Sequence, residues 1–183
     1  MDEFNELASR LVECLNISGL DYALTGALAV SFYGSPRTTS DVDVMIVIGA
    51  NKVNIPKILD ALNCAGVEAD KRRIEDAIKS GYNIATFRDK SSPYSVDFIF
   101  TDGRLDKRPG KVAGLDSFLQ QPEGLILAKL RMIKATIPRE RAQKDEDDIR
   151  TILRFTEVNI KEVRDRAKQE GTLDILDRMR AAE

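Results

Sequence analysis

The chain has 183 residues, of which 43% are hydrophobic and 32% charged, with a formal net charge of −2, as in an ordinary globular protein. It contains no histidine, which excludes serine–histidine and cysteine–histidine nucleophile pairs and histidine-containing zinc sites. Any catalysis must therefore rest on carboxylates, lysines, hydroxyl groups or a metal held by oxygen, and oxygen ligands hold hard cations such as magnesium.

Targeting signals and cysteine usage favour a cytoplasmic protein. No apolar run is long enough to cross a bilayer, and the acidic N-terminal stretch MDEFNE is unlike a signal peptide. Cys14 and Cys64 lie far apart within helical patterns. We therefore expect them to be small core residues in a reducing compartment.

Hydrophobic periodicity predicts alternating helices and strands over the first hundred residues. The expected helices cover 2–19, 27–34, 51–66 and 71–81, and the expected strands cover 21–26, 41–48, 82–89 and 94–103. Turn residues KSSP at 90–93 separate the last two strands. These two strands are therefore expected to form a hairpin.

The pattern changes after residue 101. A basic loop with glycine and proline is expected over 102–114, followed by helical patterns at 121–135, 139–155, 160–171 and 172–183. The predicted fold class is α/β (α+β): a small mixed sheet with flanking helices over 1–116, then a helical region over 117–183. Residues 104–144 carry ten bases against four acids. Such a segment is commonly a solvated helix face, and it can also bind phosphates.

Two carboxylates open the strand at 41–48. Residues two apart in a strand point to the same side, about 6.6 Å from each other, so Asp41 and Asp43 share a face, while the other face is apolar. Acids converging at the mouth of a buried strand repel each other unless cations hold them. Two metal ions about 3.5–4 Å apart are the usual clamp for in-line displacement at phosphorus.

A third carboxylate and a candidate phosphate-binding turn also occur in the sequence. Asp97 is the only acid inside the strand YSVDFIF, between apolar neighbours that indicate burial. Gly26 lies between a strand and a short helix, where backbone N–H groups and the helix dipole can receive a phosphate. Arg37, Thr39 and Ser40 precede the acids and add a cation and hydroxyl groups, which is also ordinary loop chemistry.

This arrangement resembles the signature of nucleotidyltransferases with the DNA polymerase β fold. Their pattern is Gly-Gly or Gly-Ser, a short helix, Asp-x-Asp on the next strand and a third Asp on a later strand. The run TGALAVSFYGSPRTTSDVDVMI is similar to small prokaryotic members related to the abortive-infection E toxin. In these members Arg-x-Thr-x-Asp-x-Asp recurs, and QPEGLILAKL and KDEDDI resemble their downstream helices.

The resemblance implies an enzyme of the nucleotidyltransferase class (EC 2.7.7-type) that moves a nucleoside monophosphate from an NTP such as ATP to an acceptor. Asp41 and Asp43 would bind two Mg2+ or Mn2+ ions, and Asp97 would bind one of them and act as the base. The nucleotide would be contacted by Gly26, Ala27, Arg37, Thr39, Ser40, Lys129 and Lys144. The acceptor is open: transfer RNA, a protein side chain, an antibiotic or a small metabolite all fit, and a toxin–antitoxin context would add an antitoxin partner.

Two other functions stay open. A non-catalytic nucleotide-sensing or partner-binding module on the same fold is favoured by Ala27, which stands where the family has Gly or Ser and lacks the serine hydroxyl. Convergence of the three aspartates would distinguish an enzyme from such a module. A plain nucleic-acid-binding protein is disfavoured, because only 6% of residues are aromatic and the sheet lacks an aromatic strand for base stacking. The two lysines have a simpler alternative as solvated helix positions.

Overall fold

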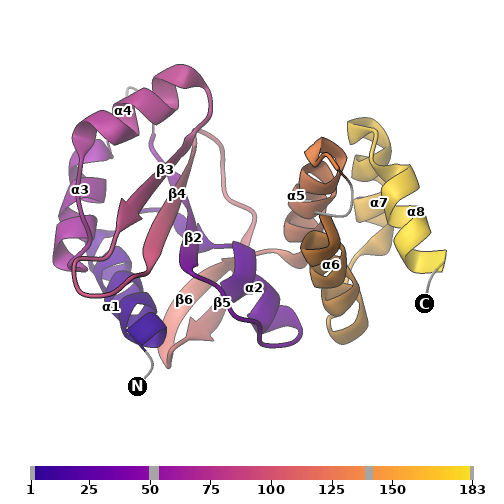
Figure 1. The fold of residues 1–183 in the computed structure, drawn as a ribbon, viewed down its shortest axis with the longest axis horizontal. Coiled ribbons are helices and arrows are strands. Elements are labelled where there is room, and N and C mark those ends of the chain that lie inside the picture. The colour runs from indigo at the N-terminus through magenta and orange to yellow at the C-terminus, as the bar shows by residue number, and fades with distance from the viewer. Residues whose placement is uncertain (1–2, 50–53, 139–141, 182–183) are drawn as a thin grey trace. The chain divides into compact units, whose positions relative to one another are not determined.

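The computed structural model describes residues 3–49, 54–138 and 142–181. The expected helix starts at 2, 51 and 139 and the expected helix end at 183 lie outside these residues. The chain divides into two compact units, Met1–Leu28 with Thr38–Gln120, and Ala29–Arg37 with Gln121–Glu183. We call them the sheet unit and the helical unit. Figure 1 shows the order of the elements along the chain.

The sheet unit is built on six strands in the order β3-β4-β2-β1-β6-β5. The strands are β1 (Tyr22–Leu24), β2 (Asp41–Val47), β3 (Ile84–Arg88), β4 (Ser95–Thr101), β5 (Lys107–Val112) and β6 (Leu115–Gln120). β2 runs parallel to β4, and β1 runs parallel to β6, whereas the other neighbours are antiparallel. The mixed sheet and the hairpin of β3 with β4 confirm the predictions.

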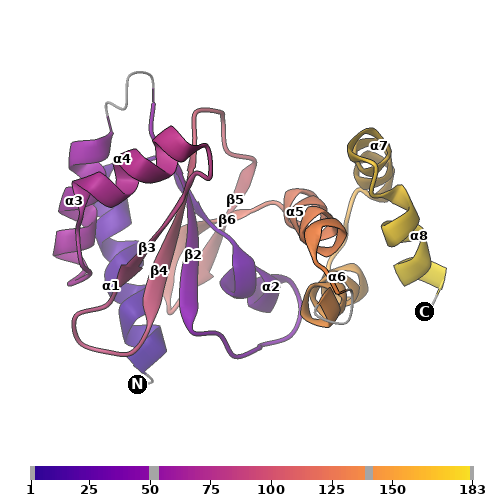
Figure 2. The ribbon, with the colours of Figure 1, turned by 45° about the horizontal axis from the view of Figure 1, so that its top comes forward.

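Three helices cover one side of this sheet: α1 (Glu3–Ser18), α3 (Ile55–Cys64) and α4 (Lys71–Ser80). Figures 1 and 2 show them together on the same side of the strands. Their apolar positions recur at helical spacing and are buried, for example Leu7, Leu11 and Leu15 in α1. Asp70 caps α4 by accepting hydrogen bonds from the Arg72 and Arg73 amides, which satisfies N–H groups at the helix start.

The region expected to be a basic loop, 102–114, contains the strand β5, which pairs with β6 along six residues. Pro109 and Gly110 disfavour a strand in sequence, but an edge strand tolerates both. Ala113 and Gly114 connect the two strands with φ values of 51° and 82°. This is the left-handed backbone that a tight two-residue hairpin needs. The expected boundary after residue 116 falls within β6, and the helices begin only at Pro122.

The helical unit contains α5 (Pro122–Ala135), α6 (Gln143–Phe155), α7 (Ile160–Glu170) and α8 (Leu173–Ala181). α5 is its core, with buried apolar residues on several sides, and it packs against α6, α7 and α8. The predicted helical C-terminal part is confirmed. No helix in the described ranges is long and apolar enough to cross a membrane.

The segment 29–37 is packed on one side of α6. Thr156 donates its hydroxyl to the Tyr33 carbonyl, and a Cβ atom at Gly34 would lie 2.3 Å from Cγ2 of Thr151. The helix α2 (Gly26–Tyr33) begins in the sheet unit and ends in this segment. The contacts hold the end of α2 against α6 within the helical unit.

The prediction of two unpaired core cysteines is wrong. Cys14 and Cys64 form a disulfide that joins α1 to α3, with their Cα atoms 5.9 Å apart. These helices pack side by side, a neighbourhood that a separation of 50 residues does not reveal in sequence. The expectation of a reducing compartment depended on unpaired thiols, so the disulfide removes its basis.

Candidate active site

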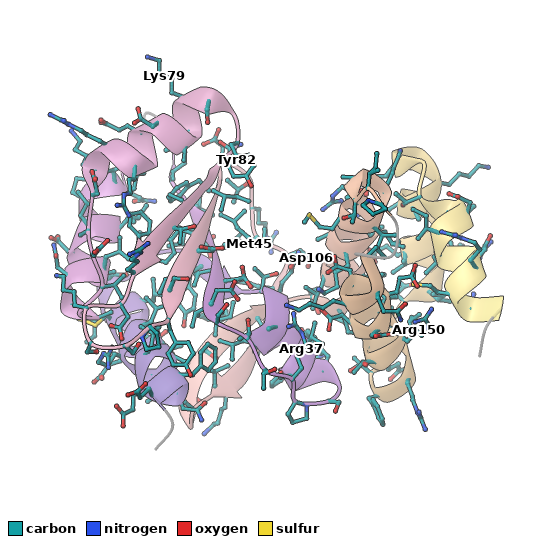
Figure 3. The ribbon with its side chains drawn as sticks, in the orientation of Figure 1. Arg37, Met45, Lys79, Tyr82, Asp106 and Arg150 are labelled. Carbon is teal, nitrogen blue, oxygen red and sulfur yellow. A yellow bond between two sulfur atoms is a disulfide. The ribbon has the colours of Figure 1, made fainter. Side chains whose placement is uncertain are left out.

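The two faces of β2 differ as the sequence predicts. Val42, Val44 and Ile46 are fully buried, while Asp41 and Asp43 lie half-buried on the opposite face. Met45 follows them on this face and is labelled in Figure 3. The strand therefore packs its apolar side into the core and directs its carboxylates away from it, which avoids burying ionised groups.

Strand register brings the third aspartate to the same place. β4 is parallel to β2, with Asp43 opposite Asp97 and Asp41 opposite Ser95. Neighbouring strands lie about 4.8 Å apart, and register partners point to the same face. Asp97 is accordingly half-buried, between the buried Val96 and Phe98. Asp43 and Asp97 are thus adjacent carboxylates on one face of the sheet.

The Asp97 side chain has an unusual environment. Its Oδ1 atom is buried and, within the described residues, has no hydrogen-bond partner. Buried polar atoms are nearly always paired, because an unpaired one costs about 1–3 kcal/mol. Such an oxygen is suited to a cation or to a donor hydroxyl from a bound molecule.

The Asp41 side chain contacts the loop that directly precedes it. The Thr39 hydroxyl donates to Oδ1 of Asp41 at 2.5 Å. In the chain outside the undescribed gaps, no group of three or more carboxylate or cysteine side chains is placed as a metal site requires. The residues present still fit a hard cation chemically, because all three are carboxylates and Asp97 has an unpaired buried oxygen.

Gly26 is in close contact with Asp43 on β2. The Thr25 amide donates to the Asp43 carbonyl at 2.9 Å, which extends β1 along β2. Gly26 then has φ of +55°, and a Cβ atom there would lie 1.8 Å from Oδ2 of Asp43. Only glycine fits this close approach. α2 starts at this point, so its first N–H groups lie next to the carboxylates.

The other predicted residues near this turn are positioned as follows. Ala27 is 2% exposed in the first turn of α2, so its side chain belongs to the core. Ser40 is exposed, and its carbonyl accepts a hydrogen bond from the Ser95 amide. In the sheet unit, Gly26 is therefore next to Asp43, while Thr39 and Ser40 directly precede Asp41.

Arg37, Lys129 and Lys144 belong to the helical unit. Lys129 on α5 is only 7% exposed, and its ammonium group lies 3.0 Å from Asp145 and 2.5 Å from Asp148. Asp148 is 3.0 Å from Nε of Arg37, which Figure 3 labels. Lys129 is thus no solvated position, and its charge balances two aspartates of α6. Lys144 is exposed on α6, and its contact with a phosphate stays a prediction.

Thr86 and Arg88 were not predicted as site residues. Thr86 pairs with Asp97, and Arg88 pairs with Ser95, so both lie on the carboxylate face. The strand pattern IATFR alternates about the buried Ala85 and Phe87. With the hairpin register known, that alternation would have placed Thr86 and Arg88 on the carboxylate face.

No family model matches the chain, and no curated protein matches it. Three solved structures share its fold at 10–15% identity. At such identities the similarity shows the fold and nothing finer.

The first two are of ANT(2″)-Ia. The solution structure of this antibiotic-resistance factor has a TM-score of 0.67 at 12% identity, over 100% of both chains. Its crystal structure in complex with adenylyl-2″-tobramycin has a TM-score of 0.61 at 10% identity, over 98% of both chains.

The third is an antigenic nucleotidyltransferase-like protein from Paracoccidioides brasiliensis. It has a TM-score of 0.54 at 15% identity, over 95% of this chain and 94% of that one. The alignments extend across the helical part as well as the sheet. The chain therefore shares the fold of these structures, in which a mixed sheet is followed by helices.

Proposed function

We propose that the protein is a metal-dependent nucleotidyltransferase, which moves a nucleoside monophosphate from an NTP to an acceptor hydroxyl. The observation that carries the proposal is the register pairing of Asp43 with Asp97, against which Gly26 closes. The shared fold with a structure holding adenylyl-2″-tobramycin supports a nucleotidyl product. The narrower resemblance to abortive-infection E toxins remains a prediction from sequence.

In the proposed reaction, the acceptor oxygen attacks the α-phosphorus of the NTP. A bond forms between these two atoms, and the bond from the α-phosphorus to the bridging oxygen breaks, so pyrophosphate leaves. Asp97 takes the proton of the acceptor hydroxyl, because its Oδ1 atom is free of protein donors in the described structure and no histidine is available. The N–H groups of Gly26 and Ala27 would hold phosphate oxygens at the start of α2.

Mg2+ or Mn2+ would be held by Asp41, Asp43 and Asp97, where it would neutralise charge on the attacking and leaving oxygens. Asp41 would have to release Thr39, which now donates to it. This explains how three carboxylates that do not converge in the absence of a cation could still serve as ligands. Without a cation, their mutual repulsion favours such an open arrangement.

The proposal is tested by incubating the protein with α-labelled NTPs, Mg2+ and an extract of RNA, protein and small metabolites. We expect label in one acceptor fraction and release of pyrophosphate, with both lost in Asp43→Asn. The alternative, a non-catalytic nucleotide-binding module, is favoured by Ala27 and by the open carboxylates. It predicts that labelled NTP is bound but that no label becomes covalently attached.

A further inference from the structure

A cavity lies beside the carboxylate face at the β3–β4 hairpin. Its volume is about 530 Å³, within the range of about 300–1,000 Å³ that is usual for small-molecule sites. Its wall includes Thr86 and Arg88 from β3, Ser95 from β4, and Ser92 and Tyr94 from the turn. Asp89 and Pro93 complete the lining, so the wall combines hydroxyl groups with a guanidinium group, a carboxylate and an aromatic ring.

Register places this wall next to the acids. Thr86 is opposite Asp97, and Arg88 is opposite Ser95, which is itself opposite Asp41. Arg88 and Asp97 are diagonal neighbours on antiparallel strands. The backbones of such residues are about 7–8 Å apart. A molecule of a few bonds in length can reach both residues.

The carboxylate of the cavity is already neutralised. Asp89 is 7% exposed and accepts hydrogen bonds from Arg10 at 2.8 Å, Ser91 at 3.0 Å and Ser92 at 2.5 Å. Burial alone would raise the pKa of Asp89, but the hydrogen bonds from Ser92, Ser91 and Arg10 and the Arg10 charge hold that pKa below its ordinary value. Asp89 is thus satisfied by the protein.

Arg88 is the opposite case. It is exposed, and among the described residues it has no ion pair and no side-chain hydrogen bond. The available charge of the cavity is therefore positive. Asp89 is the carboxylate in the cavity lining, and it is already paired, so this wall offers an amine no available acid. A phosphate, in contrast, would find the planar guanidinium fork of Arg88, which binds it well.

We propose that this cavity is the acceptor subsite and that it takes an alcohol carrying a phosphate group. The assignment of the acceptor role rests on the proposed nucleotidyl transfer. The phosphate pairs with Arg88, Thr86 and Ser95 can donate hydroxyl hydrogen bonds, and the reacting hydroxyl donates to Oδ1 of Asp97. Transfer then follows the steps given above: the hydroxyl oxygen bonds to the α-phosphorus, its proton passes to Asp97, and pyrophosphate leaves.

Ribose 5-phosphate and ribose are suitable probes, because they differ only by the phosphate. Each is titrated in EDTA, without NTP, into 15N-labelled protein, and the resonances of the Arg88 side chain and of the Thr86, Ser95 and Asp97 amides are followed. Ribose 5-phosphate is expected to shift all four, and ribose to bind at least tenfold more weakly. Arg88→Gln should weaken ribose 5-phosphate at least tenfold, and Arg88→Lys should weaken it less because the charge remains.

Arg72→Gln is the matched control, because Arg72 is an exposed arginine of the same unit on α4; it should leave binding unchanged. The proposal is overturned if ribose and ribose 5-phosphate bind equally, if Arg88→Gln binds as wild type, or if the shifts occur at Gly26 and Ala27 instead. A separate titration with Mg2+ and NTP tests the proposed nucleotidyl transfer. If that proposal is wrong, the amide resonances of Gly26 and Ala27 do not shift in this titration, whatever the result with ribose 5-phosphate.

Discussion

Gly26 and Asp43 are in such close contact that only glycine fits at position 26, since a Cβ atom there would lie 1.8 Å from Oδ2 of Asp43. Gly26→Ala must therefore displace the carboxylate or the start of α2. We expect loss of NTP binding and a stability loss of about 2–4 kcal/mol from strain and overlap together, measured by calorimetry and denaturant unfolding.

Gly19→Ala is the matched control for this change. Gly19 has a similar φ of +64°, but nothing lies within 4 Å of its Cβ position. It should cost about 1 kcal/mol from backbone strain and leave NTP binding intact. Equal behaviour of the two variants would show that the contact with Asp43 has no functional role.

Lys129 and Lys144 are expected to respond differently to alanine substitution. Lys129→Ala leaves two aspartates next to each other without their main cation, Asp148 being only 4% exposed. The loss of stability should be about 3–5 kcal/mol. Lys144 is exposed, so Lys144→Ala should change stability by less than about 0.5 kcal/mol and weaken NTP binding if the lysine contacts phosphate. Thermal melts and calorimetry separate the two effects, and an unchanged melt for Lys129→Ala would contradict this account.

The Arg10–Asp89 interaction makes stability depend on pH. Because the folded pKa of Asp89 lies below its ordinary value of 3.8, the ionised carboxylate stabilises the fold above that pH. This stabilisation is lost as the pH falls through the folded pKa. Asp89→Asn should cost about 2 kcal/mol at neutral pH, and the difference from wild type should shrink below about pH 3.8. A difference that is constant down to acid pH would argue against an ionised Asp89.

The disulfide between Cys14 and Cys64 closes a loop with a sequence separation of 50. Loop-closure entropy predicts a stabilisation of about 4 kcal/mol for a loop of this length. A reducing agent should therefore lower the unfolding midpoint of the wild type. It should have no effect on the double variant Cys14→Ala, Cys64→Ala. Identical midpoints for reduced and oxidised wild type would show that the bond does not form in solution.

Local patterns predicted the parts of the site that lie on single strands. The alternation in DVDVMIV placed Asp41 and Asp43 on one face of the strand, opposite an apolar face, and the structure confirms this. The apolar neighbours of Asp97 predicted burial, whereas the residue is half-buried. The turn at Gly26 was also visible, because a strand, a glycine and a helical pattern follow one another.

Features that depend on pairing between distant segments could not be predicted. The position of Arg88 beside the acids follows from the β3–β4 register, and β5 becomes a strand only by pairing with β6. The burial of Lys129 depends on two aspartates sixteen and nineteen residues further along the chain. From sequence alone, such a lysine is expected to be a surface charge, because its burial depends on how the helix packs.

Calorimetric titration of NTP tests whether the three strand carboxylates bind a nucleotide through a metal. Wild-type protein is measured in Mg2+ and in EDTA, beside Asp43→Asn under the same conditions. We expect at least tenfold tighter binding to wild type in Mg2+ than in EDTA, and a loss of that difference in Asp43→Asn. Equal affinity of the wild type with and without Mg2+ would contradict this expectation.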